Sequence, residues 1–123
     1  MIFDRKPSEP AADSEPKPIN VMFDVISPTS SAEMLRIIEV VNDGDKLQLK
    51  RECEDDSIPA SVLVLAPDGT FIGRVEKPYS LSFYTQIDCV MDCEAVSVLL
   101  GAQLYIRARA VFKPGSYIWH LDI

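Results

Sequence analysis

Apolar and polar residues alternate from Ile19 to Ile26 (INVMFDVI), which is the pattern of a half-buried β-strand. Pro28 ends this strand, and Ser30-x-x-Glu33 follows it as a capping box. Apolar residues then recur at helical spacing, which predicts a helix over about residues 31–41. The first two predicted elements are therefore a strand and a helix.

The middle of the chain predicts three short strands. Residues 46–50 alternate again and form the first of them. Val62–Leu65 and Phe71–Val75 flank the sequence Pro67-Asp68-Gly69-Thr70, in which Pro and Gly occupy positions that turns favour, so these two strands should form a hairpin. Gly73, inside the second strand of this hairpin, predicts a β-bulge or a close approach of another backbone.

The C-terminal third predicts a second helix and two more strands. Apolar residues at mixed three- and four-residue steps indicate a helix over residues 79–96 that bends or stops near Asp92. Residues 103–112 and 117–123 alternate as strands around the turn at Lys113-Pro114-Gly115. A strand edge near 117–123 could pair with a second copy, and the sequence leaves the oligomeric state open.

The order β-α-β-β-β-α-β-β, with its local hairpins, predicts a mainly β fold with two helices, namely a small OB-like antiparallel β-barrel. We expect residues 19–123 to form this barrel as a single domain. Residues 1–18 contain four of the nine prolines and no β-branched residue after Ile2, so they should form a flexible tail outside the core.

The composition fits one soluble domain. The chain has 123 residues, of which 47% are apolar and 25% are charged. No apolar run approaches the roughly 18 residues that a spanning helix needs, and the N-terminus lacks the features of a secretory signal. We therefore expect a cytoplasmic protein without a membrane partner, whose three cysteines are reduced thiols.

The net charge of −7 restricts the class of partner, because 19 acidic residues outnumber 12 basic ones. Counterion release favours nucleic-acid binding only where Lys and Arg cluster, so we do not expect broad, non-specific binding to duplex DNA. A small local basic pocket remains compatible with this charge.

The run VNDGDKLQLKRECEDDSIPASVLVLAPDGTFIGRVEKPYSLSFYTQID resembles the core of HIRAN domains of the stand-alone bacterial type, and the resemblance covers roughly residues 42–96. The shared pattern is Gly-Asp followed by Leu-x-Leu-x-Arg, an Asn/Asp/Pro-rich loop, a short apolar strand, Asp-Gly-x-x-Ile-Gly and an amphipathic helix. The resemblance implies a modified OB-like barrel that grips the 3′ end of single-stranded DNA.

The resemblance also implies which positions contact DNA, and at some of these positions this chain has a residue that differs from the family's. Arg74, after the Ile-Gly, and Lys77, three positions further on, keep suitable chemistry. The Arg-Tyr pair that the family has after its first strand has no counterpart here. The aromatic residue and the carboxylate of the family's loop fall on Ser57 and Ile58. Stacking on an aromatic side chain is worth about 1–3 kcal/mol per base, so these changes leave DNA-end capture open to test.

The candidate nucleic-acid-binding residues form one set: Arg51, Arg74, Lys77, Tyr79, Arg107 and Arg109. Arg107 and Arg109 share a strand face by period-2 geometry. If this face lies beside Arg74, the arginines form a cationic groove with aromatic neighbours, a surface that suits single strands and protein partners alike. The alternative is an ordinary solvent-exposed charged face.

The sequence gives less support for a metal site or a catalytic site. The carboxylates of Glu52, Glu54, Asp55 and Asp56 lack the spacing and the glycine of a calcium loop, so a solvated turn is the better interpretation. Cys89 and Cys93 lack a second ligand pair for zinc and fit small buried apolar residues better. His120 is the only histidine, and no nucleophile motif accompanies it. We expect no metal, no cofactor and no enzymatic activity.

Two functional hypotheses follow. The first is a HIRAN-like module that recognises single-stranded DNA or DNA ends. The alternative is a protein-interaction module on the same barrel in which the DNA pocket is lost.

Overall fold

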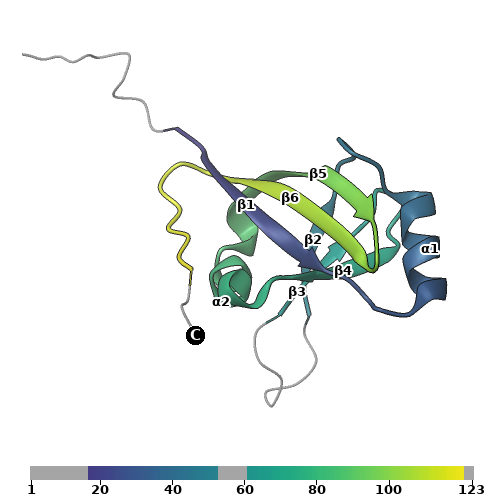
Figure 1. The fold of residues 1–123 in the computed structure, drawn as a ribbon. Helices are drawn as coiled ribbons and strands as arrows, with labels where there is room; N and C mark the ends of the chain where they lie inside the picture. The colour runs from purple at the N-terminus through teal and green to yellow at the C-terminus, as the bar shows by residue number, and fades with distance from the viewer. Residues whose placement is uncertain (1–16, 53–60, 121–123) are drawn as a thin grey trace, which may run out of the picture.

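The computed structural model describes residues 17–52 and 61–120. Six strands form one sheet in the order β2-β3-β4-β1-β6-β5, in which every neighbouring pair is antiparallel (Figure 1). The elements are β1 (Ile19–Ile26), α1 (Ser31–Val40), β2 (Gln48–Arg51), β3 (Val62–Leu65), β4 (Phe71–Val75), α2 (Lys77–Thr85), the 3₁₀ turn η3 (Ile87–Cys89), β5 (Val90–Leu100) and β6 (Leu104–Phe112). Apart from Lys17 and Pro18, the predicted tail lies outside the described residues.

The sheet curls until its two edges meet. Lys46, just before β2, forms an isolated antiparallel bridge with Glu94 of β5. Around it, the Leu47 N–H donates to the Cys93 carbonyl at 2.8 Å, and the Ala95 N–H donates to the Asp45 carbonyl at 2.9 Å. The mainly β, barrel-like fold with two helices is therefore confirmed.

The core lies inside this curled sheet. Val21, Phe23 and Val25 of β1 are buried, while the residues between them are exposed, as the alternation predicted. Phe83 of α2 closes one end, since its ring meets those of Phe23 and Phe112 edge to face, each at a centroid distance of 5.0 Å. The helix α2 is thereby fixed against the sheet.

The first helix has the cap that its sequence predicts. The Glu33 N–H donates to the Ser30 Oγ at 3.2 Å, and the Ser30 hydroxyl donates to the Glu33 Oε1 at 3.0 Å. Met34 and Ile37 form the buried face of α1. In Figure 1, α1 and α2 lie at opposite ends of the sheet.

Gly73 has both features predicted for it. The β3–β4 register shifts between Val64 and Leu65, beside Gly73. A Cβ atom at Gly73 would lie 2.5 Å from the Ile26 carbonyl oxygen and 2.7 Å from the Val25 Cγ1. The absence of a side chain therefore lets β4 pack closely against the end of β1, which brings Arg74 opposite Ile26.

The helix predicted over residues 79–96 is wrong in its second half. The helix α2 ends at Thr85, and Val90–Leu100 form the long strand β5, paired with β6. The β5–β6 register shifts twice, between Val90 and Asp92 and between Ala95 and Ser97. Each shift interrupts the period-2 alternation, so the apolar positions acquire the mixed spacing of a helix.

The strand predicted over residues 117–123 is also wrong. The described part of this segment, up to His120, belongs to no strand, and residues 121–123 lie outside the described residues. The Trp119 N–H donates to the Ser82 Oγ at 3.0 Å, and Ser82 is fully buried in α2. The segment therefore packs on a helix instead of extending the sheet (Figure 1).

Candidate functional site

A hollow of about 760 Å³ lies where the end of β1, the strand β4 and the start of α2 meet. We call it the Arg74 hollow. Its lining includes Ile26, Glu52, Phe71, Arg74, Lys77 and Ser80. Strand β4 supplies Phe71 and Arg74, and α2 supplies Lys77 and Ser80. Residues from three separate parts of the chain thus face one space.

Arg74 is held on two sides. Its Nε donates to the Glu52 Oε1 at 2.8 Å, and its Nη2 donates to the Glu52 Oε2 at 2.9 Å. Its guanidinium carbon lies 5.2 Å from the centre of the Phe71 ring, a cation–π distance. The Arg74 side chain is still 48% exposed, so a ligand can reach it.

Glu52 is positioned by the β2–β3 hairpin. Its N–H donates to the Ser61 carbonyl at 2.9 Å, which extends the strand pairing by one residue beyond Arg51 and Val62. The hydrogen bond from Arg74 is the main cause that lowers the pKa of the Glu52 carboxyl to about 2, while partial burial acts in the opposite direction. The carboxylate therefore stays charged at neutral pH.

Lys77 begins α2 beside Arg74. Pro78 follows it in the first turn of the helix, where proline is well tolerated. The Ser80 hydroxyl donates to the carbonyls of Val75 and Glu76, both at 3.2 Å, and so fixes the start of α2. Lys77 is exposed, and no ion pair of Lys77 is found within the described parts of the chain. Two of the predicted cations, Arg74 and Lys77, therefore share one hollow.

The two arginines of β6 do not lie on a strand next to that of Arg74, as the predicted cationic groove required. Arg107 and Arg109 lie together on the outer face of β6, but β1 separates them from Arg74. Arg107 donates to the Asp24 Oδ1 at 2.8 Å, and the Nη2 of Arg109 lies 3.1 Å from a carboxylate oxygen of Glu94. Each of these charges on β6 therefore has an acidic neighbour.

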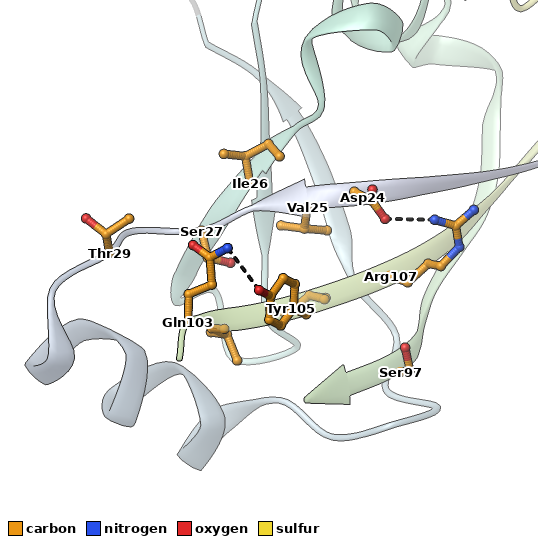
Figure 2. Close-up of a pocket in the computed structure, with 11 residues that line it drawn as sticks. Asp24, Val25, Ile26, Ser27, Thr29, Ser97, Gln103, Tyr105 and Arg107 are labelled. Atoms are coloured by element: carbon orange, nitrogen blue, oxygen red, sulfur yellow. Dashed lines mark hydrogen bonds and ion pairs between the residues drawn. The ribbon is translucent and has the colours of Figure 1, made fainter. Parts of the chain in front are cut away.

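Arg107 lines a second hollow, of about 420 Å³, which we call the Tyr105 hollow (Figure 2). Figure 2 shows the ion pair of Asp24 and Arg107 on one side and Tyr105 on the other, with the Gln103 side chain donating to the Tyr105 hydroxyl at 3.1 Å. Ile26 and Ser27 line both hollows. The two hollows therefore adjoin at the end of β1.

Arg51 and Tyr79 serve the packing of α2. The Nε of Arg51 donates to the Tyr84 carbonyl at 2.9 Å, and its guanidinium lies 5.3 Å from the centre of the Tyr84 ring. The Tyr79 ring packs on Phe83 at 5.5 Å and on His120 at 4.9 Å. Neither of these two candidates lines the Arg74 hollow or the Tyr105 hollow.

The candidate metal ligands lie apart. Within residues 17–52 and 61–120, no group of three or more His, Cys, Asp or Glu side chains is placed to hold a metal ion. Cys93 is buried, and burial raises the pKa of its thiol to about 12, so it packs as a small apolar residue. Cys53 lies outside the described residues, and so do the acidic residues of the predicted turn other than Glu52.

Among the helices of the described segments, none is long and apolar enough to cross a membrane.

Phe71 was not among the residues predicted from the sequence. In a regular strand, residues three apart point to opposite faces, so Phe71 and Arg74 were not expected to meet. The bulge beside Gly73 changes the alternation and brings both side chains to the same hollow. An aromatic face is therefore present beside Arg74, although the loop position Ser57 carries none.

The side chains of the Arg74 hollow offer two cations, one aromatic ring and two carboxylates, of which Glu52 binds Arg74, in a partly exposed space. This combination can hold an anionic group next to an apolar or aromatic one. Comparisons with protein-family models, with curated proteins and with solved structures find no match for this chain.

Proposed function

We propose that this barrel is a non-catalytic, HIRAN-like binding module that holds the end of a single-stranded DNA in the Arg74 hollow. The observation that carries the proposal is the guanidinium of Arg74 lying over the Phe71 ring in a hollow that Lys77 also lines. Arginine binds phosphate oxygens with two parallel hydrogen bonds, and lysine adds a second positive charge. Phe71 supplies an aromatic face for a terminal base.

Because the protein is negatively charged overall, we expect DNA to bind at the Arg74 hollow and not over the rest of the surface. A protein with a net charge of −7 repels a polyanion at long range. The arginines of β6 add little attraction, because Asp24 and Glu94 lie beside them. We therefore expect a short footprint, in which one strand end is held and the rest of the DNA stays outside.

Fluorescence anisotropy with labelled oligonucleotides tests the proposal. Single strands with a 3′-hydroxyl and with a 3′-phosphate are titrated against the wild type, Arg74→Ala and Arg36→Ala. Arg36 lies on an exposed face of α1 outside the hollow, so its substitution removes the same charge elsewhere. The proposal expects sub-micromolar binding that depends on the 3′ end and is weakened in Arg74→Ala only, with a salt dependence of the residual binding reduced by about one unit. Binding at roughly 10⁻⁴–10⁻⁶ M, regardless of the end, is ordinary non-specific binding and would contradict it.

The second candidate function is a protein-interaction module. It is favoured by the exposed apolar side chains on the outer face of β1, β6 and β5: Ile26 is 58% exposed, Tyr105 is 53% exposed, and Leu99 is 64% exposed. Leu99 is the cross-strand partner of Tyr105, and Ile26 lies at the edge of the Tyr105 hollow. Exposed aromatic and aliphatic side chains beside paired charges are typical of protein interfaces.

A photo-crosslinking residue at position 105 tests this candidate against the same residue at Asp68, in the exposed β3–β4 turn. One protein that crosslinks at position 105 only is then purified. The candidate requires that this protein binds the wild type and that Ile26→Glu abolishes binding. Equal crosslinking at both positions, or unchanged binding by Ile26→Glu, would exclude this face as the interface.

A further inference from the structure

The Arg74 hollow already contains an anion that belongs to the chain. Both oxygens of the Glu52 carboxylate are engaged by Arg74, one by Nε and one by Nη2. A phosphate or carboxylate ligand can bind arginine through two parallel hydrogen bonds along this same edge, from Nε and Nη2. An incoming anion and Glu52 therefore cannot occupy this edge of the guanidinium together.

We propose that Glu52 is a built-in competitor that occupies the anion position at Arg74 and has to withdraw before a ligand phosphate can bind there. This inference rests on the proposed function, because it concerns the ligand of the same hollow. It assigns a regulatory role to a residue that the sequence suggested only as part of a solvated turn.

The backbone allows this withdrawal without a change of fold. The hydrogen bond from the Glu52 N–H to the Ser61 carbonyl holds the main chain, whereas the contacts to Arg74 are made by the side chain alone. A rotation of the Glu52 side chain therefore breaks both of its hydrogen bonds with Arg74, together with the hydrogen bond that joins the Glu52 and Ser61 side chains. The Phe71 ring still supports the guanidinium from the other side.

Acidification does not release the competitor under ordinary conditions. Because Arg74 holds the pKa of Glu52 at about 2, the carboxylate remains charged over the physiological pH range. Release therefore depends on exchange with another anion, so the affinity of the site should be lower than its side chains alone would give. Conformational competition of this kind reduces the apparent affinity by the fraction of molecules in the open state.

A carboxylate beside an arginine can also have the opposite role, which is to orient the guanidinium for the ligand. The two roles predict opposite signs for one substitution. If Glu52 competes, Glu52→Gln tightens anion binding, because the amide lacks the charge. If Glu52 orients Arg74, Glu52→Gln weakens it.

The test measures anion binding directly and does not require DNA. Inorganic phosphate is titrated into full-length protein labelled with ¹⁵N-arginine, and the Nε–Hε resonance of Arg74 is followed by NMR. Wild type, Glu52→Gln and Glu33→Gln are compared. Glu33 lines the same hollow but bonds to Ser30 at the start of α1, so Glu33→Gln removes an equal charge without touching Arg74. Circular dichroism confirms that each variant is folded.

We expect Glu52→Gln to bind phosphate at least fivefold more tightly than the wild type, and Glu33→Gln to change affinity less than twofold. Unchanged or weaker binding by Glu52→Gln would overturn the inference, and so would an equal gain in both variants. The same three proteins are then tested with the 3′-phosphate oligonucleotide. If phosphate binding tightens but no variant binds the oligonucleotide, the proposed DNA function fails and the competitor role stands.

Discussion

Gly73 lies against the carbonyl of Ile26 so closely that a Cβ atom would be 2.5 Å from its oxygen. Because that oxygen belongs to the backbone, it cannot move aside as the end of a flexible side chain could. We predict that Gly73→Ala lowers the free energy of unfolding by about 1–3 kcal/mol, the usual cost of overpacking. Urea denaturation measures this change. In Gly101→Ala, the nearest atom would lie 3.9 Å away, and stability should change by less than about 0.5 kcal/mol.

The contact between β4 and β1 also places Arg74, so Gly73→Ala should affect the Arg74 hollow. The Nε–Hε resonance of Arg74 should shift in this variant even before phosphate is added. A destabilised Gly73→Ala with an unchanged Arg74 resonance would show that the hollow does not depend on this contact.

The C-terminal segment should detach when its hydrogen bond to α2 is removed. In Ser82→Ala the Trp119 N–H loses its acceptor, which should cost about 1–3 kcal/mol where the group stays buried. Trp119 is the only tryptophan of the chain, so its fluorescence reports on this segment. We expect a red-shifted emission and stronger quenching by acrylamide.

Ser80→Ala is the control for this prediction. The Ser80 hydroxyl bonds to carbonyls at the start of the same helix, and none of its hydrogen bonds reaches Trp119. Its emission spectrum should match that of the wild type. Equal red shifts in both variants would mean that the segment responds to α2 as a whole and not to Ser82.

The stability of the protein should depend on pH through Glu52. The pKa of Glu52 in the folded protein is about 2, below the ordinary 4.5 of a glutamate, so the folded state binds the proton less readily than the unfolded chain. The stabilisation from Glu52 is therefore complete above about pH 5 and is lost as the pH falls towards 2.

Urea denaturation at pH 7 and pH 3 measures this dependence in the wild type and in Glu52→Gln. The loss of stability between the two pH values should be smaller in Glu52→Gln, because this variant has no carboxylate to protonate. Identical losses in both proteins would assign the acid sensitivity to other carboxylates.

Removal of residues 1–18 should leave the barrel intact. β1 begins at Ile19, and Lys17 and Pro18 before it are exposed. The thermal midpoint of the shortened chain should stay within a few degrees of that of the full chain. A collapse of the midpoint in differential scanning calorimetry would show that these residues belong to the fold.

Local signals predicted those elements whose pattern is regular. The strict alternation of β1 and the capping box of α1 were sufficient to find both elements, with a difference of one residue at the helix end. β5 was missed because its two register shifts disguise the alternation, and pairing with β6 overrides the apparent helical spacing. The segment after β6 was misassigned because its partner, Ser82, lies 37 residues away in the sequence.

Only those contacts of the site that join residues close in the sequence could be predicted. Arg74 and Lys77 share a hollow because the chain passes directly from β4 into α2 between them. The contact of Arg74 with Glu52 joins residues 22 positions apart, and the contact with Phe71 depends on an irregularity of the strand. Whether Arg107 and Arg109 lie beside Arg74 depends on the order of the strands, which puts β1 between them.

The bridge between Lys46 and Glu94 has a consequence for the order of folding. The residues that it joins are 48 positions apart, whereas β3–β4 and β5–β6 are hairpins between neighbours in the sequence. Contacts between distant residues require the larger loss of chain entropy, so they form late. We therefore expect the hairpins β3–β4 and β5–β6 to form before the circumference closes at this bridge. In native-state hydrogen exchange, the amides of Leu47 and Ala95 should accordingly open at lower free energy than those that pair β5 with β6 in their hairpin.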